Sequence, residues 1–281
     1  MTAPIEAVVL HFTDIVTMLG AWGYLNVTET ANFLLGEWKD TDPILKDAVR
    51  RFKERWADKY RLPKDDHLDD ATIELMSRRF CNHPDILPQA LGDQAIGEGL
   101  RRWAGNRITW FDRQVQVGNF SMALAMDFTI EQTAKACNLN IAKATTPACN
   151  IQATSKRLDG PGKVLAQAWL PNAPSQLSEM KMQEFDTSET ALGQKSFSLV
   201  VLHETGHSMG LDHDSSSEVA VMDPYLNPAL VGWLPPDVAQ LQKRYGPPVA
   251  SPPPPPTPTD ELIIRVKDGV PTIDGYRVTK L

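Results

Sequence analysis

The residues most able to do chemistry lie at positions 203–213, which read His-Glu-Thr-Gly-His-Ser-Met-Gly-Leu-Asp-His. A helix repeats every 3.6 residues, so His203 and His207 would stand on one face, about one turn apart. Two imidazoles at that separation can hold one zinc ion, and Glu204 can reach a water molecule bound to it. The spacing therefore predicts a metal site on a helix.

A third ligand follows the helix. Gly210 can adopt a positive φ, which allows the helix to stop and the chain to turn sharply, so that His213 returns toward the other two histidines. Three protein ligands leave a fourth position for water, as in catalytic zinc sites. An amphipathic helix with surface histidines is the alternative, but the apolar stretch 197–202 predicts a buried start to this helix.

Met222 lies in a short apolar segment, Val221–Tyr225, that follows the zinc motif. A methionine in such a segment is most often a core residue. Here the preceding motif favours a second role. The combination resembles the metzincin metalloproteases, in which a methionine-containing turn lies beneath the zinc.

Composition limits the other classes of function. The chain has 281 residues, of which 42% are hydrophobic and 22% charged, as in soluble proteins of one or two domains. Its net charge of −7, without a dense basic stretch, argues against a nucleic-acid partner. No run of about 18 apolar residues predicts a membrane span. The N-terminus lacks the basic and apolar regions of a Sec signal peptide, which leaves the export route open.

Three cysteines are present: Cys81, Cys137 and Cys149. Cys137 and Cys149 lie in one region and could form a disulfide in an oxidising compartment, or remain buried thiols. Cys81 lies elsewhere in the chain and is left over from such a pair.

The order of predicted elements indicates an α+β chain. Residues 1–80 read as a bundle of about three helices, with one apolar stripe formed by Val49, Phe52 and Trp56 and a later helix burying Ile73 and Met76. The expected elements after it are strands at 107–117, 139–145, 149–154 and 164–170, and helices at 120–137, 194–209 and 234–245.

The composition changes abruptly after residue 246. A proline-rich segment predicts a stiff, extended linker, with a ligand for a proline-binding domain as the alternative. The tail beyond it resembles one β-hairpin that turns near Asp268 and Gly269. The expected organisation is a helical prodomain at 1–85, a connecting segment at 86–106, a catalytic domain at 107–246, a linker at 247–259 and a tail at 260–281.

With these elements in order, the chain resembles a matrixin, the matrix-metalloproteinase branch of the metzincins. The resemblance spans residues 25–246 and rests on the segments 158–168, 203–213 and 234–246. It implies a three-helix prodomain similar to peptidoglycan-binding modules. A metzincin catalytic domain would follow, with a twisted, mostly parallel sheet, a zinc helix and a methionine turn.

Matrixins hold themselves latent through a prodomain cysteine in the motif Pro-Arg-Cys-Gly-x-Pro-Asp. Here residues 79–85 read Arg-Phe-Cys-Asn-His-Pro-Asp, so the cysteine, proline and aspartate match while the arginine and glycine do not. The resemblance implies that Cys81 is a zinc ligand in the latent form, because a thiolate would displace the catalytic water. A cysteine that merely closes a helix is the alternative, and His83 could assist or replace the thiol.

The resemblance also bears on the metals. Vertebrate matrixins usually carry a structural zinc held by three histidines and an aspartate, but Gln167 and Glu184 stand at two such positions. One catalytic Zn²⁺ is therefore expected. Calcium is left open, because Asp159, Asp186 and Glu189 offer oxygen ligands. Asp214 replaces the usual serine after the last histidine and is typical of the reprolysin branch.

The resulting hypothesis is a zinc metalloendopeptidase made as a latent zymogen. Glu204 would be the general base. By the resemblance, an extended peptide would pair with the strand that carries Leu165 and Ala166, and Pro224 and Tyr225 would wall the specificity pocket. The expected partner is a protein or peptide substrate, the chain a monomer, and its location extracellular or at the cell surface. A wall- or surface-binding protein and a narrow intracellular protease are the alternatives.

Overall fold

The computed structural model describes residues 12–36, 41–86, 101–159, 162–171 and 182–249, together with strand residues 264–267, 270–273 and 276–277 of the tail. Contacts divide the chain into two units, 1–248 and 249–281. Most of the predicted proline-rich linker (residues 250–259) and most of the predicted connecting segment (residues 87–100) lie outside the described residues. Among those described, no helix is both long and apolar enough to cross a membrane.

Among the described residues, the N-terminal part contains four helices, where about three were predicted: α1 (Phe12–Ala21), α2 (Val27–Leu35), α3 (Pro43–Tyr60) and α4 (Asp70–Met76). Asn26 begins α2 with a capping box that includes Glu29, and this cap separates α2 from α1. Asp42 and Asp69 cap α3 and α4 in the same way, by accepting hydrogen bonds from backbone amides of the first turn.

The predicted stripe on α3 is buried. Val49, Phe52 and Trp56 are at most 1% exposed and pack with Trp22 of the segment after α1. Lys53 is also fully buried, and its ammonium pairs with Asp65 and Asp69. These pairs tie the segment between α3 and α4 to the bundle.

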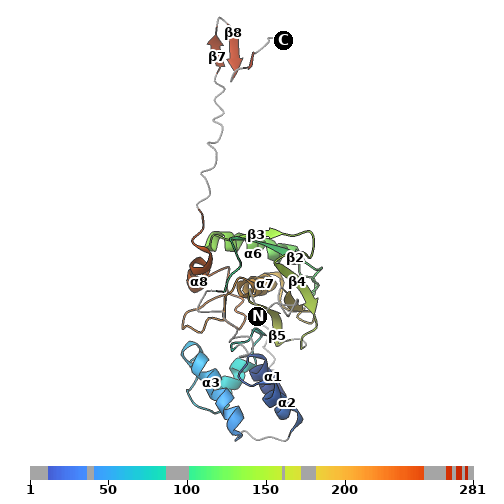
Figure 1. Cartoon of the computed structure of the whole chain (residues 1–281), viewed down its shortest axis with the longest axis vertical. Helices are drawn as coiled ribbons and strands as arrows, with labels where there is room; N and C mark the ends of the chain where they lie inside the picture. The colour runs from blue at the N-terminus through green and yellow to red at the C-terminus, as the bar shows by residue number, and fades with distance from the viewer. Residues whose placement is uncertain are drawn as a thin grey trace, which may run out of the picture. The chain divides into compact units, whose positions relative to one another are not determined.

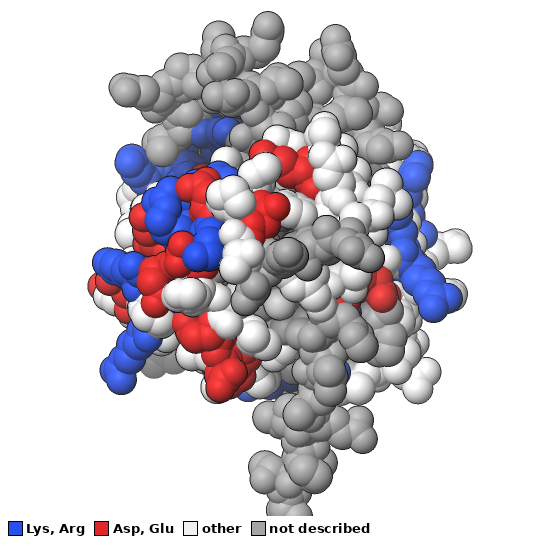
Figure 2. All heavy atoms as spheres, turned by 90° about the horizontal axis from the view of Figure 1, so that it is seen from below, with Lys and Arg blue, Asp and Glu red and all other residues white. Residues whose placement is uncertain are grey.

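The surface of these helices carries charges of both signs. Seen from below, acidic and basic side chains are intermixed (Figure 2). On α3, Arg50 pairs with Asp47 and Glu54 at helical spacing, and Arg51 pairs with Asp47. Such exposed pairs contribute little to stability individually.

A six-stranded sheet forms the second part, in the order β1-β5-β6-β4-β2-β3. Only the β5–β6 pair is antiparallel, so the predicted mostly parallel sheet is confirmed. The strands are β1 (Phe80–Cys81), β2 (Arg107–Asp112), β3 (Asn140–Lys143), β4 (Ile151–Lys156), β5 (Val164–Ala168) and β6 (Met182–Asp186).

Strand β2 is shorter than the predicted strand 107–117. The carboxylate of Asp112 accepts a hydrogen bond from the backbone amide of Val115, and Gln114 has a φ of 60°. This turn ends the strand, although the alternation of apolar residues continues through Val117.

Three helices within the described residues pack with this sheet: α6 (Met122–Ala136), α7 (Gln194–Ser208) and α8 (Pro235–Tyr245). All three match predicted helices closely. Their apolar residues share one core with the sheet, in which Met126 of α6 and Val201 of α7 pack with Trp110 and Phe185 of the strands. Figure 1 shows α7 at the centre of this part.

The tail contains a three-stranded antiparallel sheet, not the single predicted hairpin. Strand β7 (Ile264–Lys267) pairs with β8 (Val270–Ile273), and β8 pairs with β9 (Tyr276–Arg277). The sequence holds a second Asp-Gly pair at 274–275, a strong turn signal that the prediction overlooked. Residues 268–269 and 274–275 lie outside the described part of the chain.

Candidate metal centre and cleft

Helix α7 positions the first two histidines. Every residue of α7 from Phe197 to Ser208 is buried, so the helix runs through the interior rather than along the surface. The helix ends at Ser208, and the chain turns at Gly210, whose φ is +98°. A Cβ there would lie 2.0 Å from the carbonyl oxygen of Arg101, so the position requires glycine. The turn brings His213 back toward the helix.

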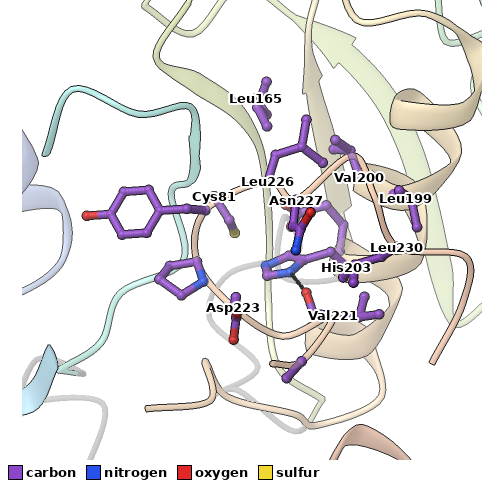
Figure 3. Close-up of a pocket in the computed structure, with 14 residues that line it drawn as sticks. Cys81, Leu165, Leu199, Val200, His203, Val221, Asp223, Leu226, Asn227 and Leu230 are labelled. Carbon is purple, nitrogen blue, oxygen red and sulfur yellow. Dashed lines mark hydrogen bonds between the residues drawn. The ribbon is translucent and has the colours of Figure 1, made fainter. Parts of the chain in front are cut away.

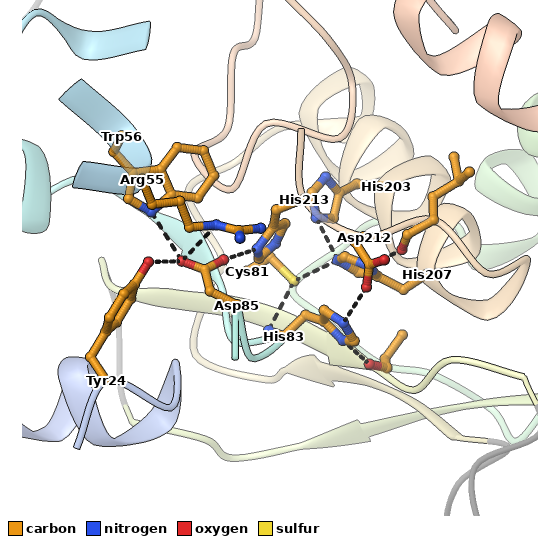
Figure 4. Close-up of polar contacts among 12 residues, drawn as sticks. Tyr24, Arg55, Trp56, Cys81, His83, Asp85, His203, His207, Asp212 and His213 are labelled. Atoms are coloured by element: carbon orange, nitrogen blue, oxygen red, sulfur yellow. Dashed lines mark hydrogen bonds and ion pairs between the residues drawn. The ribbon is translucent and has the colours of Figure 1, made fainter. Parts of the chain in front are cut away.

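Four candidate ligand atoms meet at the end of α7. One atom each from Cys81, His203, His207 and His213 lies within 4.8 Å of the others, and all four residues are buried. The two Nε2 atoms of His203 and His207 are 3.1 Å apart, and the Cys81 Sγ is 3.5 Å from the His207 Nε2. The structure thus brings together the three histidines that the spacing predicted and the cysteine that the resemblance implied (Figure 4).

A hydrogen bond on the far side of each imidazole fixes its orientation. The Nδ1 atoms of His203 and His207 each lie 2.7 Å from a backbone carbonyl oxygen, of Val221 and Leu211 respectively. The Nδ1 of His213 lies 2.9 Å from a carboxylate oxygen of Asp85. A carbonyl or carboxylate can only accept, so Nδ1 carries the proton and Nε2 is the atom left to bind a metal.

The electrostatics of the three imidazoles fit a zinc ion, whereas burial and the neighbouring Glu204 raise the pKa of the Cys81 thiol, so zinc would have to displace its proton. Burial lowers the pKa of His203 to about 3 and holds the pKa values of His207 and His213 below the usual value, so all three imidazoles are neutral at neutral pH. Among the described residues, the His213 Nε2 is buried without a hydrogen-bond partner. Neutral imidazoles and a cysteine sulfur are the donors that zinc prefers.

Glu204 stands beside these ligands and is fully buried. Burial raises its pKa to about 8. The Cys81 thiol lies beside this carboxylate and offsets part of the rise, and neither carboxylate oxygen has another hydrogen-bond partner within the described ranges. A buried carboxylate with so few partners is costly, which leaves it ready to accept a hydrogen bond from a further group.

Met222 lies against the zinc helix. A Cβ added to Gly206 would lie 2.3 Å from the Met222 Sδ, so the methionine packs on the helix backbone between the two α7 histidines. The turn is anchored by Asp237 of α8, whose carboxylate accepts hydrogen bonds from the amides of Val221 and Met222. Asp237 also caps its own helix at Leu234. Asp237 was not among the predicted site residues, although its position in the first turn of α8 was an available signal.

The cleft beside this centre is already filled by the chain itself. Strand β1 pairs in parallel with the edge of β5, and the amide of Asn82 donates to the carbonyl of Ala166. On the opposite wall, the amide of Cys81 donates to the carbonyl of Pro224 at 2.8 Å. The edge strand and wall that were expected to receive a peptide thus both contact residues 79–82.

A small cavity of about 30 Å³ remains next to the Cys81 side chain. Its lining includes Glu204 and three of the four predicted substrate-binding residues, namely Leu165, Pro224 and Tyr225 (Figure 3). The fourth, Ala166, is buried on β5 and uses its backbone in the pairing with residues 79–82.

Comparison with known proteins decides the family. The matrixin family model matches residues 76–246, well over half of the chain. The chain belongs to the matrixin family. Stromelysin-1 of the horse is 31% identical over 206 residues, which cover 66% of this matrixin and 40% of the horse protein. Stromelysin-1 of the rat is 26% identical over 241 residues, which cover 79% of this matrixin and 47% of the rat protein. Human matrix metalloproteinase-17 is 26% identical over 176 residues, which cover 56% of this matrixin and 29% of the human protein. This matrixin spans less than half of the length of these relatives.

His83 of this matrixin does not join the four ligand atoms. Its ring stacks on that of His207, with the centroids 3.9 Å apart. Its Nδ1 lies 3.0 Å from the carbonyl oxygen of Ala168, and its Nε2 lies 3.9 Å from Asp212. The side chain therefore supports the His207 ring instead of replacing the thiol.

The two positions at which vertebrate matrixins place structural zinc ligands hold a different network here. The Gln167 amide donates to the carboxylate of Glu184 at 2.5 Å, and Lys156 donates to the same carboxylate at 3.2 Å. The Glu184 carboxylate is thus paired with one basic and one amide side chain.

The carboxylates considered for calcium surround the segment before β5. Asp186 accepts hydrogen bonds from the amides of Leu158 and Asp159 and from Ser188, and Glu189 accepts one from the amide of Gly162. Burial alone would raise the pKa of Asp186, but these hydrogen bonds outweigh it and lower the pKa. Residues 160–161 of this segment lie outside the described ranges, and a calcium site stays a prediction.

The other two cysteines are not joined in the described structure. The Cys137 Sγ contacts the carbonyl of Thr133, and the Cys149 Sγ contacts the carbonyl of Ile151. The predicted alternatives were a disulfide or two thiols, and in the structure both residues are thiols.

Proposed function

We propose that this matrixin is a zinc metalloendopeptidase that the structure captures in a latent form, with Cys81 at the catalytic metal. The observation that carries the proposal is the group of four buried ligand atoms within 4.8 Å, with Glu204 next to it. His203, His207 and His213 would hold the zinc in both the latent and the active form. Cys81 would hold it only in the latent form.

The bound zinc would polarise a peptide carbonyl and lower the pKa of a water molecule toward ~7. Glu204 is placed to act as the general base. It would take the proton of the attacking water and deliver it to the leaving amine. Burial raises the pKa of this carboxyl to about 8, which suits it to holding that proton between the two steps.

The latent state would depend on residues 79–82 filling the cleft as well as on the Cys81 thiol at the zinc. Residues 79–82 form hydrogen bonds with both walls of the cleft, so a substrate cannot enter until they leave. An extended peptide would then pair with β5 in place of β1. Its side chain would enter the space next to Leu165, Pro224 and Tyr225.

The N-terminal helices favour this zymogen over a wall-binding module. A wall-binding module would present a free aromatic groove away from the zinc. Instead, the aromatic core of the helices includes Phe80 and Tyr225, and the Trp22 ring lies 5.9 Å from the His213 ring. We therefore assign residues 1–85 to a prodomain, 86–106 to a connecting segment, 107–246 to the catalytic domain, 247–259 to a linker and 260–281 to a tail. As in matrixins generally, the location would be extracellular or at the cell surface, and the substrate a protein.

The proposal is tested by incubating the purified full chain with zinc and a denatured protein substrate, with and without a zinc chelator. We expect cleavage within residues 86–106 of the chain itself, followed by cleavage of the substrate. Both should stop with the chelator. Intact substrate after deliberate proteolytic removal of residues 1–106 would contradict the proposal.

A further inference from the structure

Lys59, near the end of α3, is held in a pocket built by another part of the chain. Its side chain is 4% exposed. The ammonium donates hydrogen bonds to the carbonyl oxygens of Glu218 at 2.7 Å and Ser216 at 3.0 Å. It also pairs with a carboxylate oxygen of Asp223 at 2.5 Å and one of Asp214 at 3.7 Å. We call these four oxygens, from Asp214, Ser216, Glu218 and Asp223, the acceptor pocket.

The acceptor pocket belongs entirely to the segment after the zinc helix. Asp214 organises it by accepting hydrogen bonds from the amide and the hydroxyl of Ser216, both at 2.9 Å. The amide of Asp214 donates to the carbonyl of Met222, which places Asp214 and Asp223 side by side. Only the cation comes from the N-terminal helices. If those helices depart, two carboxylates and two carbonyls are left facing one another without a positive charge.

The geometry suits a primary ammonium better than a metal ion. Three oxygens converge on the Lys59 nitrogen at 2.5–3.0 Å: two carbonyl oxygens accept its hydrogen bonds, and the Asp223 carboxylate forms an ion pair with it. Calcium takes six to eight oxygens at about 2.3–2.6 Å, more than the pocket supplies. A guanidinium is planar and wider, and would not place its donors on oxygens that converge on one point.

The acceptor pocket adjoins the cleft. Asp223 also lines the cavity next to Cys81, and it immediately precedes Pro224, the wall residue that binds the Cys81 amide (Figure 3). A peptide lying in the cleft therefore passes within reach of this carboxylate.

We propose that the acceptor pocket is a binding site for a primary ammonium, filled by Lys59 in the latent form and by a lysine side chain of the substrate after the N-terminal helices leave. The binding half of this proposal is independent of catalysis. The substrate half rests on the proposed function.

Chemical rescue in the full chain tests the binding half. The variant Lys59→Ala removes the ammonium and leaves space for n-butylammonium, which should raise the Tm of the variant in a saturable way. Tetramethylammonium, which has no N–H donor, should not. The matched control Lys64→Ala removes an exposed lysine whose partner, Asp58, is 76% exposed, and should show no rescue. The double variant Lys59→Ala/Asp214→Ser should lose most of the rescue. Equal responses to both amines would overturn the proposal.

If Lys59→Ala does not fold, Lys59→Arg serves instead, and it should have a lower Tm than the parent although the charge is kept. A Tm equal to that of the parent would overturn the preference for a primary ammonium.

For the substrate half, peptides that carry lysine or norleucine at each position in turn are compared on the activated protein. We expect about a tenfold higher kcat/KM for lysine at one position, reduced in Asp214→Ser. Cleavage that is equal at all positions would refute this half alone. A failure of the proposed function would appear instead as no chelator-sensitive cleavage.

Discussion

The carboxylate of Asp85 lies 2.9 Å from the Nδ1 of His213, and so links the N-terminal segment to a candidate zinc ligand beyond the cysteine. Its other oxygen accepts hydrogen bonds from the Tyr24 hydroxyl at 2.7 Å and the Trp56 indole at 3.0 Å, and Arg55 lies 3.6 Å away. The matrixin motif has an arginine where this chain has the buried Phe80. Here α3 supplies a guanidinium to the aspartate from a distant part of the sequence (Figure 4).

Asp85 is therefore expected to hold the latent form closed. The side chain of Asp85 is fully buried, so the variant Asp85→Ala leaves Arg55 and the Nδ1 of His213 without their acceptor. The free energy of unfolding should fall by about 3–5 kcal/mol. We expect faster alkylation of Cys81 and faster self-cleavage. Asp58→Ala, at a carboxylate that is 76% exposed, is the matched control and should leave both rates unchanged. Parent-like rates in Asp85→Ala would show that the thiol alone maintains latency.

Glu204→Ala should abolish peptide cleavage while zinc stays bound. The variant keeps all four candidate ligands and removes only the proposed base, so activity should fall by on the order of 10²–10⁴-fold. Zinc content by atomic absorption and cleavage of a fluorogenic peptide measure the two properties separately. Turnover close to that of the parent would exclude Glu204 as the base.

Cys81→Ala should yield a chain that cleaves itself without an added protease. Removal of the thiol opens the fourth position to water, although residues 79–82 keep their backbone pairing and will slow the entry of substrate. The self-cleavage rate is measured beside that of Cys149→Ser, a cysteine remote from the cleft. If both variants are as latent as the parent, Cys81 is not the switch.

The buried Glu204 also predicts a pH dependence in the metal-free protein. Its pKa is about 8 in the folded chain and near 4.5 when unfolded, so its contribution to stability is complete below pH 4.5 and is lost as the pH rises through 8. His203 acts in the opposite direction. Its folded pKa of about 3 lies below the ordinary 6.5, so its contribution is present above pH 6.5 and is lost as the pH falls toward 3.

The two effects are separated by comparing the parent with Glu204→Gln in the presence of a chelator. The Tm of the variant should exceed that of the parent by an amount that grows between pH 5 and pH 9. A difference that stays constant over this range would mean that Glu204 does not carry its proton into the neutral range.

The parts of the site that depend on local geometry could be read from the sequence. The positions of His203, His207 and His213 follow from one helix and one turn at Gly210, and both are properties of neighbouring residues. The apolar stripe on α3, four of the six strands and the helices α6, α7 and α8 followed from periodicity in the same way, whereas β1 and β6 were not predicted. Boundaries were less accurate where a side chain ended an element early, as Asp112 does for β2.

Contacts between distant residues could not be read in this way. Nothing in the pattern around Asp85 indicates His213, which lies 128 residues away, and nothing around Lys59 indicates Asp223. Both contacts depend on how the N-terminal helices pack against the cleft. Cys81 was identified only through the resemblance to the matrixin motif, because one cysteine near a helix end has no distinctive spacing.

X-ray absorption at the zinc edge of the purified full chain tests the central claim most directly. We predict three nitrogen ligands at about 2.0–2.1 Å and one sulfur at about 2.3 Å. The sulfur should be replaced by an oxygen or nitrogen in Cys81→Ala and remain in Cys149→Ser. A zinc site in the parent that contains only nitrogen and oxygen would contradict the account, because the chain would then be held inactive, if at all, without the thiol.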